Sequence, residues 1–532
     1  MSWSAFTESS WPVITAIDFA ASRCSVGRIV SHWPGWAAIS SRVWIVVFLI
    51  SLATPAHGEG TLLRVPAVIH AHSNWSTGEY SLDDLAAQAK TFGVAAIFLT
   101  ENHLLQYEYG LPPLRGLLRY RAEFPSVLSK GPEAFLDAVR AANAKQQDVL
   151  LIPGAQVVPH YFWTGTLLDG TLTMHNTQKD LLALGLYHPE DYRELPAVGN
   201  YGAARWGLWS LWLLSPFLLA IPGVWLIRTH RQHVIQLQHF RITERRRMVL
   251  PGLLCLGIGI ALLANNYPFR SNPASPYDPT AGLKPHQDVI DFVNARKGVA
   301  IWSLPEASDH QEVGVARFHA TIHTDPYPND LLRTDRFTAF GGLYEDTTIF
   351  VEPGRGWDQL LLDYLNGLRV TPAWAIGESA YHYEGQAGKW LGAVQTVLLA
   401  ERRDPATLLA ALRAGRAYAL LRTREEALRL VQFQAISSGL APAEMGDRLT
   451  LRAGDRPELQ AVVETAGGRP LSTEVRLIRS GKVVHSIQGD TPITLRWTEP
   501  PMPPGSKLYY RLDVRGPGGN QILSNPIFIQ TT

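Results

Sequence analysis

The chain has 532 residues, of which 46% are hydrophobic, so it is long enough for two or three domains with sizeable cores. Its formal net charge of +1 gives no electrostatic reason to expect a nucleic-acid partner. The two cysteines are Cys24, near the N-terminus, and Cys255, in an apolar run. A disulfide framework or a cysteine-based zinc site is therefore excluded from the segments expected to be soluble.

The N-terminal region has the pattern of a leader. Residues 43–50 form an apolar run that follows Arg42 and precedes the mostly small residues 53–56. This arrangement is typical of a signal peptide or a short membrane anchor. We therefore expect residues 1–60 to be a leader that sends the following segments out of the cytoplasm.

The first predicted strand ends in two histidines. Residues 65–69 are apolar enough for a buried strand, and His70 and His72 come directly after it. Side chains at positions i and i+2 of an extended strand point the same way, so both imidazoles are expected on one face. Imidazole and carboxylate groups suit zinc, manganese or iron, and this pair would form half of such a site.

A capped helix and a second strand follow. Ser81 can cap a helix that Gly93 ends, and residues 94–99 are again apolar. Glu101 and His103 follow the end of this second strand and could add a carboxylate and an imidazole to the site. Two neighbouring parallel strands that both end in candidate ligands are typical of the rim of an α/β barrel.

Two longer apolar segments interrupt this pattern. Residues 206–227 carry no charge and are long enough to span a membrane, whereas residues 248–264 are uncharged but short for a span. A buried core helix is the alternative for the second segment. The loop between them contains one acidic residue, Glu244, and six arginines, at positions 228, 231, 241, 245, 246 and 247. Short arginine-rich loops stay in the cytoplasm, so residues 200–268 are expected to form a transmembrane hairpin with both flanks outside.

Helix–strand alternation resumes over residues 285–422 and favours a mainly parallel sheet. Asp404 can cap a helix that has Pro405 at its first position and Gly415 at its end. From residue 428 to residue 532 the pattern changes to short alternating strands separated by glycine-rich turns. That pattern predicts a β-sandwich.

These motifs together resemble a known family. The segments His70-Ala71-His72-Ser73 and Thr100-Glu101-Asn102-His103 are similar to the opening motifs of the PHP domain, the polymerase and histidinol phosphatase metallohydrolases. The resemblance implies an α/β fold, a distorted (β/α)7 barrel built from residues 61–195 and 285–422 and interrupted by the transmembrane helical hairpin. The C-terminal β-sandwich resembles a domain attached to some family members. Further similar segments are residues 150–156, 181–185, 300–306 and 376–382.

Several ligand positions of the family pattern hold other residues in this chain. Gln156 stands where the family has Glu, Leu304 where it has His, and Ala380 where it has Asp; Glu378, close by, could replace the last. The family's Asp-His is Glu101-Asn102 here, with the histidine displaced by one position. The metal ligands that the resemblance implies are therefore His70, His72, Glu101, His103, Asp180 and His382, enough for one or two divalent ions of zinc, manganese or iron.

These features predict a membrane-anchored, periplasmic or cell-surface metal-dependent hydrolase that acts on a phosphoester or a related small-molecule ester. His103 or His382 would complete the metal shell or move protons in catalysis. The alternative is a catalytically inactive PHP-derived binding or sensory module at the membrane. The substituted ligand positions favour that alternative, whereas the retained histidines favour the enzyme.

Overall fold

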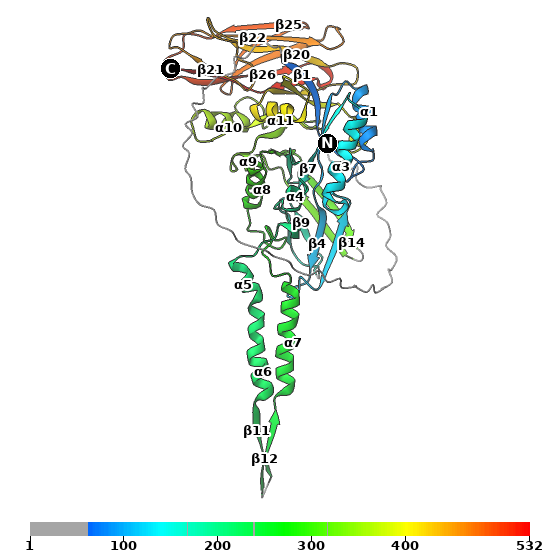
Figure 1. The fold of residues 1–532 in the computed structure, drawn as a ribbon. Helices are drawn as coiled ribbons and strands as arrows, with labels where there is room; N and C mark the ends of the chain where they lie inside the picture. The colour runs from blue at the N-terminus through cyan, green and yellow to red at the C-terminus, as the bar shows by residue number, and fades with distance from the viewer. Residues whose placement is uncertain (1–61, 168, 238–239, 316–317) are drawn as a thin grey trace, which may run out of the picture. The chain divides into compact units, whose positions relative to one another are not determined.

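The strand that leads to His70 and His72 has neighbours on both sides within a sheet (Figure 1). The computed structural model describes residues 62–167, 169–237, 240–315 and 318–532, and the expected leader lies outside these ranges. Strand β1 (Leu63–Ala71) is parallel to β2 (Ala96–Leu99), which is parallel to β6 (Leu150–Ile152). On its other side β1 is antiparallel to β18 (Val394–Ala400).

A second sheet contains the strands that carry the other motif segments. Its strand order is β17–β16–β13–β10–β7–β3. Strand β10 is antiparallel to both of its neighbours, and the remaining pairs are parallel. The bounds are β3 (Glu101–Asn102), β7 (Gly154–Val157), β10 (Leu181–Leu184), β13 (Val299–Trp302), β16 (Ala339–Leu343) and β17 (Trp374–Gly377).

The two sheets share continuous stretches of chain. Strand β2 is followed after Thr100 by β3, and β6 is followed after Pro153 by β7, so each stretch leaves one sheet and enters the other. Pro153 has no backbone N–H to donate, which interrupts the hydrogen-bond ladder at that residue. These strands therefore pair in two sheets, and the residues that follow β17 connect them on the other side, because the amides of Ser379 and Tyr381 donate to the carbonyls of Ile69 and His70 at the end of β1, each at 3.0 Å. The expected mixed α/β class is confirmed, and the (β/α)7 closure stays a prediction.

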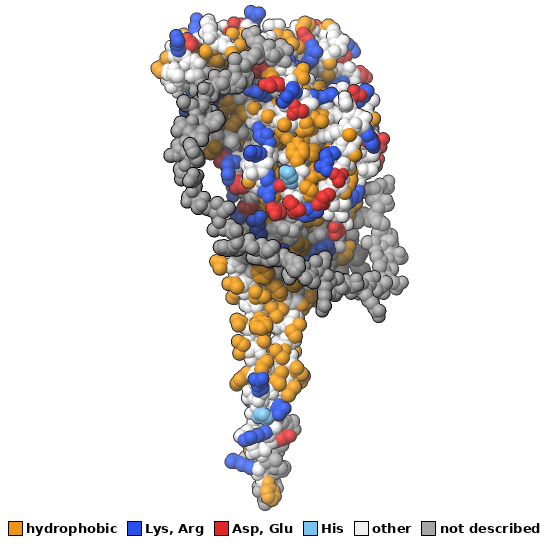
Figure 2. Space-filling view, viewed as in Figure 1, with side chains coloured by type: hydrophobic (Ala, Val, Ile, Leu, Met, Phe, Trp, Pro, Cys, Tyr) orange, Lys and Arg blue, Asp and Glu red, His pale blue; other side chains and the backbone are white. Residues whose placement is uncertain are grey.

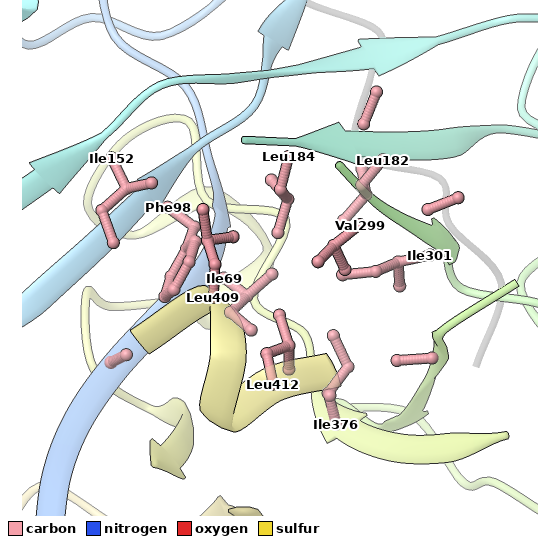
Figure 3. Packing of buried hydrophobic residues seen from close by; sticks show 14 of the residues in the cluster. Ile69, Phe98, Ile152, Leu182, Leu184, Val299, Ile301, Ile376, Leu409 and Leu412 are labelled. Carbon is pink, nitrogen blue, oxygen red and sulfur yellow. The ribbon is translucent and has the colours of Figure 1, made fainter. Parts of the chain in front are cut away.

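One hydrophobic core lies between these sheets and their helices. Figure 3 shows Ile69 and Phe98 from the first sheet converging with Leu182 and Ile376 from the second and with Leu412 of α11 (Pro405–Ala414). Burial on this scale is the main favourable contribution to folding. The other helices that contribute buried side chains to this core include α1 (Leu82–Thr91), α3 (Pro132–Lys145), α8 (Lys284–Ala295) and α10 (Gly356–Leu365).

The first sheet continues into the C-terminal region. Strand β19 (Ala417–Leu421) pairs with β18 on one side and with β27 (Gln521–Ser524) on the other. A three-stranded sheet of β20 (Leu428–Ile436), β22 (Glu458–Thr465) and β25 (Ile493–Thr498) encloses a second core against it. The sandwich layers therefore share a sheet with the preceding region. The other strands there are β21 (Arg448–Leu451), β23 (Ser472–Arg479), β24 (Lys482–Asp490), β26 (Lys507–Arg515) and β28 (Ile527–Thr531).

The predicted hairpin segment contains two helical stretches long and apolar enough to cross a membrane, Leu208–Arg228 and Val249–Asn266. Only 11% of each is buried, and Figure 2 shows apolar side chains covering the visible face of this pair. Gly252 lies so close to the other helix that a Cβ there would stand 2.7 Å from the carbonyl oxygen of Gly223. Small residues permit such close packing of membrane helices. The elements are α5 (Leu208–Leu214), the 3-10 helix η2 (Ser215–Leu219), α6 (Ala220–Arg228) and α7 (Val249–Asn266).

The arginine-rich loop between these helices is an antiparallel ribbon of β11 (His230–Leu237) and β12 (Phe240–Arg247). At the other end of the pair, the loop between β4 (Leu105–Gly110) and β5 (Arg119–Phe124) contacts α7, because the Gly116 amide donates a hydrogen bond of 2.7 Å to Asn265 Oδ1. The hairpin is thus joined to the α/β region at the helix ends opposite the arginines. Three further helices of the α/β region are short: α2 (Val127–Lys130), α4 (Pro189–Arg193) and α9 (Pro328–Leu331).

Candidate metal centre

The end of β1 brings the two predicted histidines together. Both side chains are buried, and His70 Nε2 lies 3.1 Å from His72 Nε2. The strand is not regular at this point: the pairing with β2 shifts register between Ile69 and Ala71, and His70 has a φ of 72°. A left-handed backbone at a residue with a side chain costs about 1–3 kcal/mol and is concentrated at functional sites. The side chains of His70 and His72 therefore meet through a bulge at the end of β1, and not through the regular alternation of an extended strand.

A carboxylate lies behind His70 and orients its ring. Glu378 Oε1 is 2.6 Å from His70 Nδ1 and also accepts a hydrogen bond from Ser303 Oγ at 2.5 Å. Its second oxygen accepts from the Leu304 amide at 2.9 Å. A carboxylate only accepts hydrogen bonds, so His70 donates from Nδ1, and in that tautomer Nε2 keeps a lone pair. Carboxylates arranged this way commonly orient metal-binding histidines.

A second carboxylate orients His72 through a serine. Ser76 Oγ donates to Glu101 Oε2 at 2.5 Å and lies 3.2 Å from His72 Nδ1. Since the single hydroxyl hydrogen is directed to Glu101, His72 Nδ1 donates to the serine oxygen and Nε2 keeps its lone pair. Burial, with the nearby charges of His382, His70 and Lys389, holds the pKa of His72 well below its usual value, so the ring stays neutral.

These two nitrogens fit a divalent ion. Two nitrogen ligands on one tetrahedral zinc ion, each about 2.0–2.1 Å from it, are roughly 3.3 Å apart. The 3.1 Å between the lone pairs of His70 and His72 is close to this value. Imidazole is a ligand that zinc, iron and copper share. In the described ranges, however, no group of three His, Cys, Asp or Glu side chains is arranged around one point, so the fit rests on this pair.

Glu101 follows the second strand as expected, but its contacts are with the serines of the first motif. Its Oε1 accepts hydrogen bonds from the Ser73 amide at 2.8 Å and from Ser73 Oγ at 2.5 Å. Burial raises its pKa to about 7, against the opposing effect of the serine hydrogen bonds. Both carboxylate oxygens are therefore engaged in holding the Ser73–Ser76 turn, through which Glu101 acts on His72.

The two predicted catalytic histidines lie in different surroundings. The His382 ring stacks on His72 with centroids 4.2 Å apart, its Nδ1 is 3.0 Å from Thr77 Oγ1, and burial lowers its pKa to about 3. His103 Nε2 instead bonds the carbonyl oxygen of Tyr192 at 2.6 Å, and burial lowers its pKa to about 4. The geometry therefore brings His382 to the histidine pair and directs His103 towards α4.

Asp180 presents an oxygen that has no partner within the described residues. Gln156 Nε2 donates to Asp180 Oδ2 at 2.5 Å, whereas Asp180 Oδ1 is buried without a hydrogen bond. Burial raises the pKa of Asp180 to about 8, and the charge of Glu378 adds to the rise. A buried carboxylate oxygen without a donor is suited to a cation, so Asp180 also fits a metal.

Two of the substituted positions keep an unusual backbone. Leu304 has a φ of 39° and Ala380 a φ of 45°, both in the region that side chains disfavour. The Ala380 carbonyl accepts a hydrogen bond of 3.3 Å from the buried Lys389 ammonium, and so does the Ser379 carbonyl at 3.1 Å. Sequence reasoning did not single out Ser76, Ser303 or Lys389, because their roles arise from hydrogen bonds between distant segments.

Proteins similar to this chain are found among solved structures. No family model and no curated protein matches the chain. Among solved structures, a two-domain protein from Bacteroides vulgatus, described as containing a predicted PHP-like metal-dependent phosphoesterase, is 12% identical. The match covers 85% of this chain and 90% of that one, with a TM-score of 0.33. A candidate metal-dependent phosphoesterase from Bifidobacterium adolescentis is 13% identical over 61% of this chain and 88% of that one, with a TM-score of 0.25.

Proposed function

We propose that this chain is a PHP-like metal-dependent phosphoesterase, held at a membrane by the 200–268 hairpin and acting on its extracytoplasmic side. The observation that carries the proposal is the facing pair of His70 Nε2 and His72 Nε2, 3.1 Å apart. In the tautomers that carry the hydrogen on Nδ1, both Nε2 atoms have lone pairs that a divalent cation could accept. A divalent ion held there would supply Lewis acidity and lower the pKa of its water.

The surrounding residues have separate roles in this proposal. Glu378 and Ser76 fix the two rings, and Asp180 is a further candidate ligand that does not form a group of three with the two histidines in the described ranges. His382, stacked on His72, is the group placed to move a proton. Lys389 carries a buried positive charge whose effect reaches both His72 and His382. Its ammonium also lies 3.8 Å from Glu345 Oε2, so this charge is paired within the protein.

Membrane attachment and orientation are part of the same proposal. The ends of α6 and α7 next to the arginine-rich ribbon would face the cytoplasm, in keeping with the preference of short basic loops for that side. Asn265 at the other end of α7 bonds Gly116, so the metal-centre segments would lie on the opposite side of the membrane. The periplasm or the cell surface is the location that this arrangement supports.

The test uses the full-length chain purified in detergent, with metal content measured by elemental analysis and activity on a panel of phosphomonoesters and phosphodiesters. We expect one or two divalent ions per chain and hydrolysis of at least one substrate. His70→Asn with His72→Ala should remove both metal and activity; asparagine is used at position 70 because it tolerates the left-handed backbone. His485→Ala, on β24, is the matched control. Three tightly held ions, or unchanged metal in the double variant, would contradict the proposal.

A catalytically inactive PHP-derived module at the membrane is the second candidate. The observation that favours it is the contact between Gln156 and Asp180, in which an amide donates to a carboxylate at a position where the family pattern has an acidic ligand. Leu304 and Ala380 likewise offer no ligand atoms in their side chains. Such a module would purify without stoichiometric metal, so the elemental analysis separates the two candidates before any substrate is found.

A further inference from the structure

A row of three histidines crosses a small sheet outside the candidate metal centre. The sheet has the order β14–β15–β9–β8, with β14 (Asp309–Val315), β15 (Phe318–Thr324), β9 (Thr173–His175) and β8 (Phe162–Thr164). His310 is the register partner of His323, and His323 is the register partner of His175. Directly opposed residues on neighbouring strands project from the same face, so the three imidazoles lie side by side.

The contacts between these rings are close. His310 Nδ1 is 3.2 Å from His323 Nδ1, with ring centroids 5.4 Å apart, and the His175 centroid is 6.0 Å from that of His323. Two rings bound to one tetrahedral ion have centroids about 5 Å apart, given a metal–nitrogen distance of about 2.0–2.1 Å. The His310–His323 pair is therefore close to chelating geometry, and His175 lies slightly farther away.

A carboxylate orients the central ring. His323 Nε2 is 3.0 Å from Asp325 Oδ1, so the tautomer with its hydrogen on Nε2 is favoured, and in that tautomer the Nδ1 lone pair is directed at His310. The His323 side chain is 36% exposed, which leaves the pair open to ions from solution. On its other side, His175 bonds Thr164 Oγ1 at 2.7 Å and stacks on Phe162 with centroids 4.9 Å apart. The outer ring of the row is thus held in place by its neighbours.

We propose that His310 and His323 form a second metal site, which chelates one Cu²⁺, Ni²⁺ or Zn²⁺ ion with water in the remaining positions and His175 beside it. Imidazole pairs favour these three ions, with Cu²⁺ bound most tightly in the order that divalent metals follow. The site is distinct from the His70–His72 pair and does not depend on the proposed hydrolysis. Binding there would tie β14 to β15 by a side-chain bridge.

The second site is connected to the candidate metal centre through the backbone. The Asn176 amide donates to the His323 carbonyl at 3.0 Å, and the Gln178 amide donates to Thr324 Oγ1 at 3.3 Å. Asn176 and Gln178 lie four and two residues before Asp180. Ion binding at the histidine row would therefore stiffen the segment that presents Asp180, which gives the second site a route to influence the first.

The test counts Cu²⁺ and Zn²⁺ bound by the tag-free full-length chain in detergent, in a background with His70→Asn and His72→Ala so that the first site does not contribute. We expect one ion per chain, with nitrogen hyperfine structure in the Cu²⁺ electron paramagnetic resonance spectrum. His310→Gln with His323→Gln should abolish this ion and its nitrogen signal. Circular dichroism and the thermal transition of the ion-free protein confirm that the variant is folded.

His319→Gln is the matched control. His319 lies on the same strand and face as His323, four residues and about 13 Å away, and its register partner is Gly314. This substitution should leave the stoichiometry and the spectrum unchanged. The proposal is overturned if the background protein binds no ion, if the double variant retains it, or if His319→Gln removes it as effectively.

Discussion

At the scale of single residues, the candidate metal centre is defined by the carboxylates behind the histidines. Glu378 accepts three hydrogen bonds, from His70 Nδ1, Ser303 Oγ and the Leu304 amide. Glu101 likewise holds Ser73 and Ser76 and reaches His72 only through the latter. Neither carboxylate is placed as a direct ligand by these contacts; each fixes the tautomer of a ring that could be one.

Glu378→Gln tests the role of the orienting carboxylate. The amide NH₂ group would meet the donors that now surround Glu378, so the His70 ring would lose its fixed tautomer. We expect metal affinity to fall by about 10–100-fold, the usual effect of removing such a partner. Competition with a chelator of known affinity measures the change. Glu384→Gln, at an exposed position nearby, is the control, and an unchanged affinity in Glu378→Gln would rule out the assigned role.

His286 provides a test of pH dependence away from the metal centre. The side chain is buried on α8, stacks on Trp302 with centroids 5.1 Å apart, and has a pKa lowered by burial to about 3. The unfolded chain binds the proton at about pH 6.5 and the folded chain does not, so stability is lost as the pH falls from about 6.5 towards 3.

His286→Phe keeps the aromatic ring and removes the titration. We expect the melting temperature of the parent protein to fall more steeply between pH 7 and pH 4.5 than that of the variant, by at most about 1.4 kcal/mol of unfolding free energy per pH unit. Thermal unfolding across this range measures the difference. Parallel pH profiles for the parent and His286→Phe would refute the assignment.

At the scale of elements, the sequence predicted the helix ends, because these depend on interactions between adjacent residues. Ser81 caps α1 as expected, with its side chain accepting from the Asp84 amide, and α11 begins after Asp404 and ends at Gly415 with a φ of 71°. These predictions are confirmed because caps and left-handed ends depend on adjacent residues. The (β/α)7 closure stays a prediction, because it depends on the pairing of strands that lie far apart in the chain.

In the candidate site, too, features set by adjacent residues could be predicted from the sequence, and contacts between distant segments could not. The strand end that carries His70 and His72 could be predicted from an apolar run followed by two histidines. The partners of their rings could not, because Glu378 comes from a segment 308 residues away and meets His70 only in the folded chain. The histidine row across β14, β15 and β9 was also not predictable, since the hairpin separates β9 from the other two strands.

The hairpin itself leads to a prediction about topology. A reporter that is active only in the cytoplasm, inserted after Arg247, should be active, and an export-dependent reporter fused after Thr532 should be active in the same cells. Basic residues close to the ends of membrane helices determine this orientation. Replacing Arg231, Arg241, Arg245 and Arg247 by serine should reduce the fraction of correctly oriented chains. The reverse pattern of activity in the unmodified hairpin would defeat the arginine argument.

At the scale of the whole described molecule, the α/β region and the C-terminal strands behave as one structure because they share a sheet and a buried ion pair. Strand β19 joins β18 to β27. Arg511 on β26 makes two 2.8 Å contacts with the carboxylate of Asp358 on α10, and both side chains are almost fully buried. Tyr509 donates a further hydrogen bond of 2.7 Å to Asp358. The attached strands are therefore expected to unfold together with the α/β region.

The buried pair allows this coupling to be measured. Arg511→Met leaves the Asp358 carboxylate buried without its guanidinium, so we expect unfolding to become easier by about 3–5 kcal/mol. Adding Asp358→Leu removes the unpaired charge and should recover part of this loss, although Tyr509 then lacks its acceptor. Arg429→Met, which breaks an exposed pair with Glu464, should cost less than about 1 kcal/mol. Hydrogen exchange should show both regions opening earlier in Arg511→Met; destabilisation confined to the C-terminal strands would mean that the two regions unfold independently.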